Sequence, residues 1–551
     1  MPHPTIDAGD ALPLTLPSLL HRRARDLGDA AFLVVDDERL SYREAECRSR
    51  ALARGLIAIG VGKGTHVGLL HPNGAGMVVA CLAAMRIGAV AAPLSTFSRP
   101  REIAELVRNA DIDVLLSSKS YRSHYYLQTL RAAFPELDPT VPGPLWSPSA
   151  PTLRRIAFDP APTGVHVDWT CQALFAAADA ADDAEDAGSG GGLDAVLAAM
   201  EADVSPSDRM VIIHTSGSTS APKGVVHSHG ALIRHVDNLN SHRRLDRSEI
   251  LFSNSPFFWI GGFAYTLLGT LIAGARLVCS NAHHASDVLD VLERERPTMV
   301  NGFAQSVAHL PNDPSFAGRD LSSIRRGNLY PILPRALQPA DPGLRHAMLG
   351  MTEAGSVCLD APDDRDLPEH QRGSFGRPAL GFESRIVDRE THAVSPTGAL
   401  GELAVRGPFL MEGYLGRERH ETFEPDGWFR TGDLFHVDED GLHYFHGRAG
   451  SMIKTGGANV SPREVEAVIH DLTGCTAIVL GLPDAERGQR VAALVVTPAA
   501  IDLDRLEAAL RERLSAYKVP RVFLELRQED VPLMSSGKFD MRAIEKIFDG
   551  R

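Results

Sequence analysis

Residues 210–226 read Met-Val-Ile-Ile-His-Thr-Ser-Gly-Ser-Thr-Ser-Ala-Pro-Lys-Gly-Val-Val, a β-branched run followed by a loop of small hydroxyl residues. The run Met210–Ile213 predicts a buried parallel strand. The loop after it holds glycines, a proline and a lysine, a composition that favours neither helix nor strand. Backbone N–H groups and hydroxyls in such a loop can face an anion, and Lys223 adds a full positive charge. We therefore expect a phosphate-binding loop, against the alternative of an ordinary Ser/Gly turn.

This loop differs from the P-loop of nucleoside triphosphatases. In the P-loop a Ser or Thr follows the lysine, whereas Gly224 follows Lys223 here. The order of residues in the loop is therefore more informative than its composition.

Composition and charge limit the class of protein. At 551 residues the chain is too long for one hydrophobic core, so we expect two or more domains. A net charge of −14 argues against a nucleic-acid partner, which would require a basic surface. No apolar stretch reaches the roughly 18–20 residues of a membrane span, and the first residues show no signal-peptide pattern. Six scattered cysteines without metal-ligand spacing favour reduced thiols in a cytoplasmic enzyme.

The order of helix and strand patterns indicates the domain organisation. Helices and strands alternate between residues 39 and 117, as in parallel sheets with helical crossovers. Within this part, Ser41 with Glu44 three residues later predicts a capping box at a helix start. A strand-rich stretch at 382–448 predicts a small β subdomain. We expect a domain boundary near 449–451, which separates an N-terminal domain (1–450) from a C-terminal domain (451–551).

An acidic, alanine-rich stretch at 176–192 ends in a run of glycines. Low complexity and charge of this kind predict a flexible loop. A role as a lid or as a docking segment for a partner stays open.

Four further segments follow the 215–224 loop in order. They are Gly350-Met351-Thr352-Glu353, residues 427–434 (Gly-Trp-Phe-Arg-Thr-Gly-Asp-Leu), residues 447–457 (Gly-Arg-Ala-Gly-Ser-Met-Ile-Lys-Thr-Gly-Gly) and residues 532–542 (Pro-Leu-Met-Ser-Ser-Gly-Lys-Phe-Asp-Met-Arg). Together with the loop, this series resembles the core motifs of the adenylate-forming superfamily of acyl-CoA synthetases, peptide-synthetase adenylation domains and luciferases. The resemblance covers nearly the whole chain. It implies an α/β fold: a large N-terminal domain of stacked mixed sheets with helices and a small β subdomain, then a mobile α+β C-terminal domain.

The resemblance also implies the first half of a reaction, in which ATP converts a carboxylic acid to an acyl adenylate. Nucleotide-binding residues are expected at Thr215, Ser216, Gly217, Ser218, Thr219, Lys223, Asp433 and Arg448. Thr352 can bond a phosphate oxygen, and Glu353 is a hard oxygen ligand suited to Mg²⁺. Lys538, on a loop of the C-terminal domain, is expected to reach the carboxylate and the α-phosphate.

The second half is expected to transfer the acyl group to CoA. The C-terminal domain is then expected to rotate about a hinge at Ser451 and to present Lys454, Gly456 and Gly457 to the CoA thiol. Glycine at 456 and 457 would let the pantetheine arm pass close to the backbone.

The resemblance places the acyl pocket around residues 254–263. Its expected members are Phe257, Phe258, Trp259, Gly261, Gly262 and Gly302. Aromatic residues in such a run can also be plain core. An apolar pocket with room beside the two glycines favours a hydrophobic, bulky carboxylic acid over an amino acid.

Four departures from the family pattern concern mainly the nucleotide. Leu349 stands where the family has an aromatic residue, Ser220 replaces a glycine of the phosphate loop, and Ser451 replaces the hinge aspartate. Residues 328–331 (Asn-Leu-Tyr-Pro) replace a Gly-Gly-Ala turn.

These departures leave several functions open. The expected function is a complete acyl-CoA ligase that uses ATP, Mg²⁺, CoA and a small carboxylic acid. The alternatives are a homologue that mainly transfers a preformed acyl adenylate to CoA, a non-catalytic adenylate-binding protein, and an enzyme that loads a carrier protein. The sequence leaves the acyl group and the oligomeric state open.

Overall fold

The computed structural model describes residues 11–185, 192–215, 222–303, 306–361, 365–448, 453–532, 539 and 541–549. The expected strand at 210–213 is β9 (Arg209–Thr215), which runs parallel to β4 (Val90–Pro93) and antiparallel to β10 (Lys223–Ser228). Its residues 210–213 are buried, as the β-branched run requires. The phosphate-loop expectation for 216–221 falls outside the described residues. What the structure does define is the two strands that hold the ends of this loop.

Two large sheets form the body of the N-terminal part. The first has the order β14-β13-β11-β12-β1-β2 and the second the order β20-β10-β9-β4-β3-β5-β8. The strands of the first are β1 (Ala31–Val35), β2 (Glu38–Ser41), β11 (Ile250–Phe252), β12 (Arg276–Cys279), β13 (Met299–Val300) and β14 (Arg326–Gly327). The second adds β3 (His66–Leu70), β5 (Val114–Ser117), β8 (Arg155–Phe158) and β20 (Gly413–Tyr414). A short hairpin pairs β6 (Ser120–Tyr121) with β7 (His124–Tyr125).

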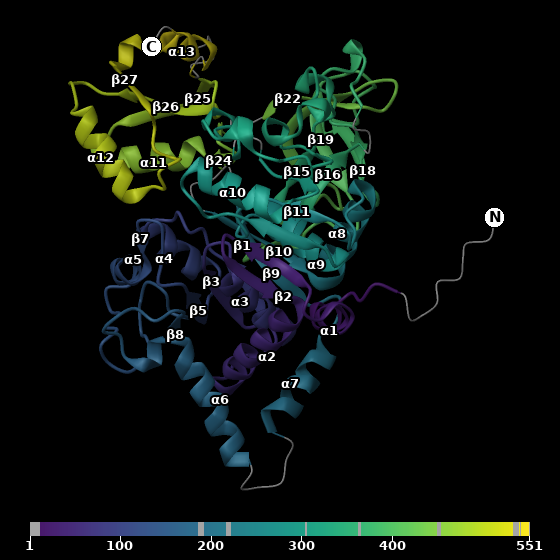
Figure 1. Ribbon diagram of the computed structural model, residues 1–551. Coiled ribbons are helices and arrows are strands. Elements are labelled where there is room, and N and C mark those ends of the chain that lie inside the picture. The colour runs from purple at the N-terminus through teal and green to yellow at the C-terminus, as the bar shows by residue number, and fades with distance from the viewer. Residues whose placement is uncertain are drawn as a thin grey trace, which may run out of the picture.

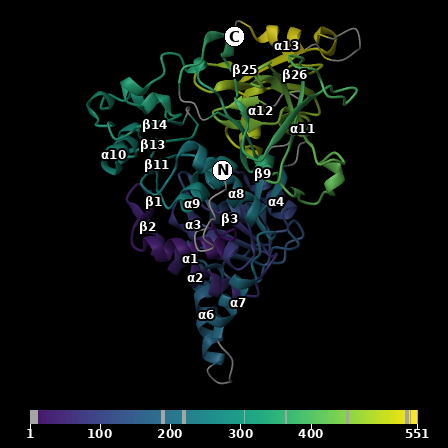
Figure 2. The ribbon, with the colours of Figure 1, turned by 90° about the vertical axis from the view of Figure 1, so that its right-hand side faces the viewer.

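Helices pack on and between these sheets (Figure 1, Figure 2). The helix α3 (Ala75–Arg86) is buried almost all round, and its core cluster includes residues of both sheets. A helix that is apolar on every face has to be an interior helix. The other helices are α1 (Leu16–Leu27), α2 (Tyr42–Ala58), α4 (Pro100–Asn109), α5 (Tyr126–Ala133), α8 (His229–Arg243), η2 (Gly261–Leu268), α9 (Gly269–Ala273) and α10 (Ala285–Glu295). The predicted capping box is present at the start of α2, with Ser41 and Glu44 bonded reciprocally.

The stretch 176–192 corrects the expectation of a flexible loop. The helix α6 (Cys171–Glu185) includes 176–185, and α7 (Gly192–Asp203) begins at 192, while 186–191 lie outside the described residues. The two helices extend away from the body of the molecule (Figure 1). Alanine has the highest helix propensity, and Arg54 on α2 forms ion pairs with Asp182 and Asp194. Helix propensity and these ion pairs therefore stabilise helices in a stretch whose acidic, low-complexity composition predicts flexibility.

The small β subdomain has two sheets. One has the order β15-β16-β17, with β15 (Leu349–Met351), β16 (Ser356–Asp360) and β17 (Arg377–Pro378). The other has the order β18-β19-β21-β22, with β18 (Glu383–Val387), β19 (Gly401–Arg406), β21 (Phe429–Val437) and β22 (His443–Arg448). These strands agree with the strand-rich pattern at 382–448.

The C-terminal part is an α+β unit with its own sheet. Its strands are β23 (Ile453–Thr455), β24 (Ala458–Val460), β25 (Thr476–Asp484), β26 (Gly488–Val496) and β27 (Val522–Leu526). The helices α11 (Pro462–Thr473) and α12 (Leu503–Arg513) share one buried cluster with the sheet, and α13 (Met541–Phe548) shares another. The sheet is therefore covered on both faces. No helix among the described residues is long and apolar enough to cross a membrane.

Buried histidines give the fold a defined response to acid. Burial lowers the pKa of His71, His227 and His229 to about 4 and that of His235 to about 3. An unfolded histidine titrates near 6.5, so between pH 6.5 and 4 the unfolded state binds more protons. The free energy of unfolding therefore falls as the pH drops through this window.

We expect His235→Phe to reduce this pH dependence. The ring of His235 lies 5.5 Å from that of Phe409 in a stacked pair, where a phenyl ring can replace it. The slope of unfolding free energy against pH between 6.5 and 4 should fall by about one proton, or roughly 1.4 kcal/mol per pH unit. Urea unfolding at stepped pH measures the slope. The exposed His283→Gln serves as control and should leave it unchanged.

Candidate active site

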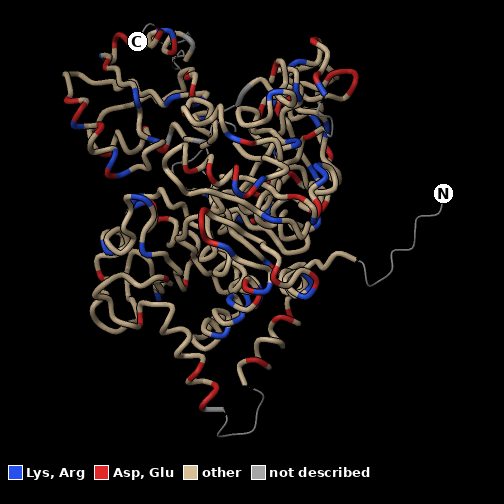
Figure 3. Tube along the Cα trace, viewed as in Figure 1, with Lys and Arg blue, Asp and Glu red and all other residues tan. Residues whose placement is uncertain are grey.

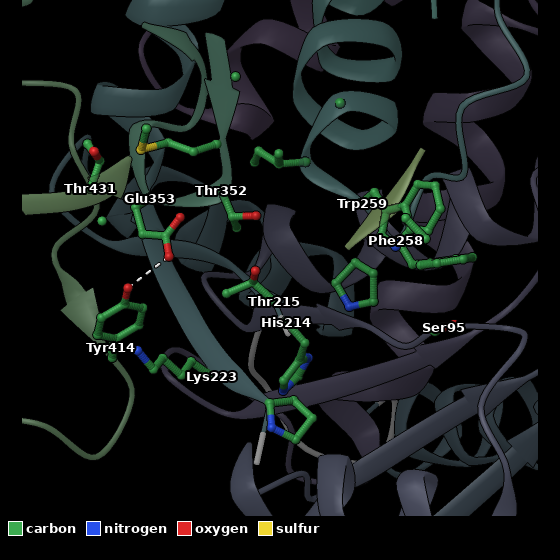
Figure 4. Close-up of a pocket in the computed structure, with 18 of the residues that line it drawn as sticks. Ser95, His214, Thr215, Lys223, Phe258, Trp259, Thr352, Glu353, Tyr414 and Thr431 are labelled. Carbon is green, nitrogen blue, oxygen red and sulfur yellow. Dashed lines mark hydrogen bonds between the residues drawn. The ribbon is translucent and has the colours of Figure 1, made fainter. Parts of the chain in front are cut away.

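A cavity of about 520 Å³ lies where the second large sheet, the β subdomain and the C-terminal unit meet. Its wall takes residues from β9 and β10, from the segment before η2, from the end of β15, from β21 and from the C-terminal unit. Figure 4 shows residues of several of these elements pointing toward one another. Segments far apart in the sequence therefore form one site.

The phosphate side of the cavity is lined by Thr215 and Lys223, which flank the loop outside the described residues. The Lys223 ammonium lies 4.6 Å from the ring centre of Tyr414, and the Tyr414 hydroxyl donates to Glu353 Oε1 at 2.8 Å. Burial lowers the pKa of Lys223; Arg417 lowers it further and Glu353 opposes both. At one end of the cavity the lysine is thus held against the Tyr414 ring and the carboxylate against the Tyr414 hydroxyl (Figure 4).

Thr352 and Glu353 lie on a short 3-10 turn after β15. The Nε2 of the buried His227, on β10, donates to the carbonyl oxygen of Thr352 at 2.7 Å. Because burial keeps His227 neutral at pH 7, this bond is between neutral groups. His227 therefore fixes the backbone of the turn that presents both side chains.

The expected ribose side lies on β21 and β22. Thr431 and Gly432 line the cavity, and Asp433 follows them, with only 3% of its surface exposed. The backbone of Asp433 pairs with that of Arg448 on β22. Asp433 is therefore beside the wall of the cavity and next to Arg448, whose side chain lies outside the described set.

Part of the expected acyl pocket lines the cavity. Phe258, Trp259 and Gly261 are on the wall, together with Phe303, whose ring lies 5.8 Å from that of Trp259. A Cβ added at Gly261 would meet nothing within 4 Å, so the wall is open there.

Two of the expected acyl-pocket residues are elsewhere. Phe257 packs into the core around α3 and is 1% exposed. A Cβ on Gly262 would lie 2.0 Å from the carbonyl oxygen of Pro256, so this glycine is required by backbone packing. The sequence-based assignment of these two residues to the pocket is corrected. Gly302, with φ of +151°, lies between Asn301 and Phe303 and is not on the wall itself.

The C-terminal unit closes the cavity. Gly457 and Ala458 line it, together with Tyr517 and Lys518. A Cβ on Gly457 would lie 3.0 Å from Phe303 Cγ, so the C-terminal unit touches the aromatic wall directly. Gly456 and Lys454 are not on the wall. The Lys538 and Ser451 expectations fall outside the described residues.

A buried charge cluster joins the C-terminal unit to α4. Lys518 Nζ donates to Glu102 Oε1 on α4 and to Glu464 Oε1 on α11, both at 2.8 Å. The Ser515 hydroxyl donates to Glu102 Oε2 at 2.7 Å. Burial lowers the pKa of Lys518, but Tyr517 and the two carboxylates outweigh it and raise the pKa above its ordinary value. The cation therefore stays charged inside the interface.

Sequence reasoning missed Tyr414, Phe303, Glu102 and Lys518. Tyr414 reaches the site because β20 pairs with β10, where Val225 faces Tyr414. Glu102 and Lys518 are 416 residues apart. No spacing rule in a single sequence predicts these contacts. Only the charge of Lys518, between Tyr517 and Val519 on the turn after α12, could have pointed to a buried partner.

Comparison with known proteins identifies the family of this chain. The chain matches the AMP-binding enzyme model over residues 20–415 and the AMP-binding enzyme C-terminal domain model over residues 464–538. It is 32% identical to a feruloyl-CoA synthase of Amycolatopsis sp, covering 96% of this chain and 98% of the relative. It is 30% identical to a Mycobacterium tuberculosis CoA ligase of a methyl-dioxo-octahydroindenyl propanoyl group, covering 97% and 99%.

A solved structure supports the fold. The o-succinylbenzoate CoA synthetase of Bacillus subtilis, bound with a product analogue, matches with a TM-score of 0.73 at 23% identity, over 96% of this chain and 98% of the other. The family model alone spans more than half of the chain. The chain therefore belongs to the AMP-binding enzyme family, in the acyl-CoA ligase branch of the adenylate-forming superfamily, and is an AMP-forming acid–thiol ligase.

Proposed function

We propose that this protein converts a hydrophobic carboxylic acid, with room for a bulky group, to its CoA thioester through an acyl adenylate. One observation carries the proposal. A single cavity brings the phosphate-side residues Lys223 and Glu353 together with Gly457 of the C-terminal unit, and the rings of Phe258, Trp259 and Phe303 lie on its wall. An activating group, an apolar substrate and a thiol can therefore meet in one space.

The donor set at the phosphate side fits ATP and Mg²⁺. Lys223 supplies a cation and Thr215 and Thr352 supply hydroxyls for phosphate oxygens, while Glu353 supplies an oxygen ligand. Mg²⁺ is usually bound through one or two carboxylates and substrate phosphates. When bound, the metal would neutralise charge that develops on the phosphates. Asp433 would accept hydrogen bonds from the ribose hydroxyls.

We assign the observed arrangement of the C-terminal unit to the thioester-forming half-reaction. Gly457 and Ala458 reach the cavity, and α13, which follows the segment of Lys538, packs on the other face of the C-terminal sheet from α11 and α12. Rotation near Ser451 would replace the Gly457 face by Lys538 for adenylation. The acid would be activated in one arrangement and transferred in the other.

The relatives support a ring-bearing or bulky acyl group. Their names specify a feruloyl group and a bicyclic dioxo-octahydroindenyl group. In this chain the aromatic wall and the open space at Gly261 would accept a ring.

Two half-reaction assays test the proposal. ATP–pyrophosphate exchange with a panel of hydrophobic acids should be robust, and synthetic acyl-AMP with CoA should give thioester. Exchange at background with rapid thioester formation would favour the transfer-only alternative. Failure of both, with retained adenylate binding, would favour a binding protein. If a phosphopantetheinylated carrier protein outcompetes free CoA in the assay, the acceptor of the acyl group is the carrier protein and not CoA.

We expect Glu102→Gln to slow thioester formation selectively. The change removes one of the two carboxylates that hold Lys518 in the interface, so the C-terminal unit should dock less firmly on α4. Loss of about 1.4 kcal/mol of docking corresponds to a rate about ten-fold lower. The rate to measure is that of thioester formation from acyl-AMP. Pyrophosphate exchange by the same variant should be unchanged or faster.

The matched control is Glu105→Gln, also on α4, whose carboxylate pairs with the half-exposed Arg101. Both half-reactions should then stay within two-fold of the wild type. Equal loss of both rates in Glu102→Gln would contradict a docking role.

A further inference from the structure

The turn after β20 brings a second cation to the phosphate side of the cavity. Arg417 lines the wall together with Lys223 and Tyr414. Its guanidinium carbon lies 5.7 Å from the centre of the Tyr414 ring, and Lys223 Nζ lies 4.6 Å from the same point. The hydroxyl of that tyrosine is the group that donates to Glu353 (Figure 4). Two positive charges are therefore held against one ring, beside the carboxylate.

Backbone hydrogen bonds fix the position of Arg417. Its N–H donates to the Tyr414 carbonyl oxygen at 3.1 Å and closes a turn whose third residue, Gly416, has φ of +73°. A positive φ at the third residue of a turn favours glycine. The Leu415 N–H donates to the Gly224 carbonyl oxygen on β10 at 2.8 Å. The turn is thus tied to the strand whose first residue is the phosphate-side lysine.

Neither cation on the phosphate side is paired with a carboxylate. Lys223 and Arg417 form no ion pair within the part of the chain that the structure describes. The other lysine and the other arginine among the described wall residues, Lys518 and Arg430, each pair with a glutamate. Glu421, also on the wall, accepts from a backbone N–H of its own turn at 2.7 Å. The two unpaired cations are therefore left to attract a ligand.

The charge on this side of the cavity is that of an anion site. Burial and then the charge of Arg417 lower the pKa of Lys223, while Glu353 opposes them. Over the rest of the molecule basic and acidic residues are interspersed (Figure 3). An anion with several negative oxygens would relieve the repulsion between the two cations. A guanidinium suits such an anion, because its planar fork can donate two parallel hydrogen bonds to a phosphate.

Arg417 differs from the next arginine along the chain. Arg419 Nη1 donates to the Glu412 carbonyl oxygen at 3.0 Å, and its guanidinium lies 4.2 Å from the centre of the Phe423 ring. Arg419 is not on the cavity wall. The guanidinium of Arg417 donates no hydrogen bond to any described residue, and its side chain is exposed. A ligand in the cavity can therefore reach the donors of Arg417.

Adenylate formation generates negative charge on a leaving group. In this step a carboxylate oxygen of the acid bonds to the α-phosphorus of ATP, and the bond from that phosphorus to the oxygen shared with the β-phosphate breaks. The electron pair of the broken bond stays on that oxygen, so negative charge grows on the departing pyrophosphate. Fixed cations and donors aimed at developing charge lower the barrier of such a step.

We propose that Arg417, together with Lys223, binds the pyrophosphate part of ATP and stabilises it as it leaves. The proposal rests on the proposed function and adds to it a residue that the sequence motifs did not indicate. Arg417 then acts in adenylate formation and in its reversal. Transfer of the acyl group from acyl adenylate to CoA involves no pyrophosphate and does not use Arg417.

Arg417→Met is the first test. Methionine keeps an apolar contact with Tyr414 but has neither charge nor hydrogen-bond donor. We expect the KM for pyrophosphate in ATP–pyrophosphate exchange to rise about ten-fold or more. Thioester formation from synthetic acyl-AMP should stay within about two-fold of the wild type. A pyrophosphate KM within about two-fold of the wild type overturns the proposal, and so does equal loss of both half-reactions.

Two further variants show whether the charge at this position is the cause. Arg419→Met removes a cation from the same segment without changing the cavity wall, and its pyrophosphate KM should equal that of the wild type. An equal rise in Arg417→Met and Arg419→Met would assign the effect to general surface charge and overturn the proposal. Arg417→Lys keeps the charge without the planar fork, so its KM should lie between those of the wild type and Arg417→Met. A lysine variant no better than the methionine variant would also overturn the proposal.

A binding measurement separates this inference from the proposed function. Magnesium pyrophosphate is titrated calorimetrically into the AMP-saturated wild type, Arg417→Met and Arg419→Met. A Kd about ten-fold higher in Arg417→Met alone, with no acid supporting exchange or thioester formation, would keep the anion site and reject the ligase. Thioester formation from an acid and ATP, with equal Kd values in all three proteins, would keep the ligase and reject the site.

Discussion

Replacing Glu353 with glutamine will suppress adenylate formation and leave thioester formation from preformed acyl adenylate nearly intact. The carboxylate is oriented by the Tyr414 hydroxyl, 2.8 Å from Oε1, and it lies on the turn next to Thr352. Glutamine keeps the size and one acceptor but removes the negative charge that would hold Mg²⁺ against the phosphates. Loss of one preorganised electrostatic group typically costs about 10²–10³ in rate.

The measurement is pyrophosphate exchange beside thioester formation from synthetic acyl-AMP. Tyr414→Phe is an intermediate case, because it keeps the ring beside Lys223 and removes only the hydrogen bond, so exchange should fall about ten-fold. The exposed Glu439→Gln is the control and should change neither rate. Exchange within two-fold of wild type in Glu353→Gln would remove Glu353 from the metal site.

Local patterns in the sequence predicted local structure well. The Ser41–Glu44 capping box and the strand after Arg209 depend on neighbours within one or two turns, and both are present. The expectation of a flexible loop was wrong for 176–185 and for 192, which are helical, because composition was weighed above alanine's helix propensity and above ion pairs to α2, which a single sequence does not reveal. Local signals are therefore reliable where tertiary contacts do not compete.

Residues of the site were predicted unevenly for a similar reason. Motif order indicated Lys223, Thr352 and Glu353, and the structure brings them to one cavity. Whether a glycine opens a pocket or relieves a backbone contact depends on its surroundings: Gly261 faces open space, and Gly262 faces the Pro256 carbonyl. Neighbouring glycines look alike in the sequence, and only packing distinguishes them.

Gly457→Val should have the opposite effect to Glu353→Gln. It should suppress thioester formation at least about a hundred-fold, since an ångström-scale displacement of reacting groups can cost that much, and leave pyrophosphate exchange nearly unchanged. The reason is steric. A Cβ at Gly457 would lie 3.0 Å from Phe303 Cγ and 3.1 Å from its Cδ1, so a valine has to push the C-terminal unit away from the aromatic wall. The assay is CoA transfer from synthetic acyl-AMP.

The chain offers a matched control one residue away. Gly456 also has a positive φ, +56° against +83° for Gly457, but a Cβ there meets nothing within 4 Å. Gly456→Val therefore introduces similar backbone strain, about 1–2 kcal/mol, without the contact.

If both variants lose thioester formation equally, strain in the turn explains the loss and not the contact with Phe303. If only Gly457→Val loses it, trimming the wall by Phe303→Ala in the same chain should restore part of the rate, because the obstructing ring is gone. Reciprocal loss in Glu353→Gln and Gly457→Val would then show that the two ends of one cavity serve separate chemical steps.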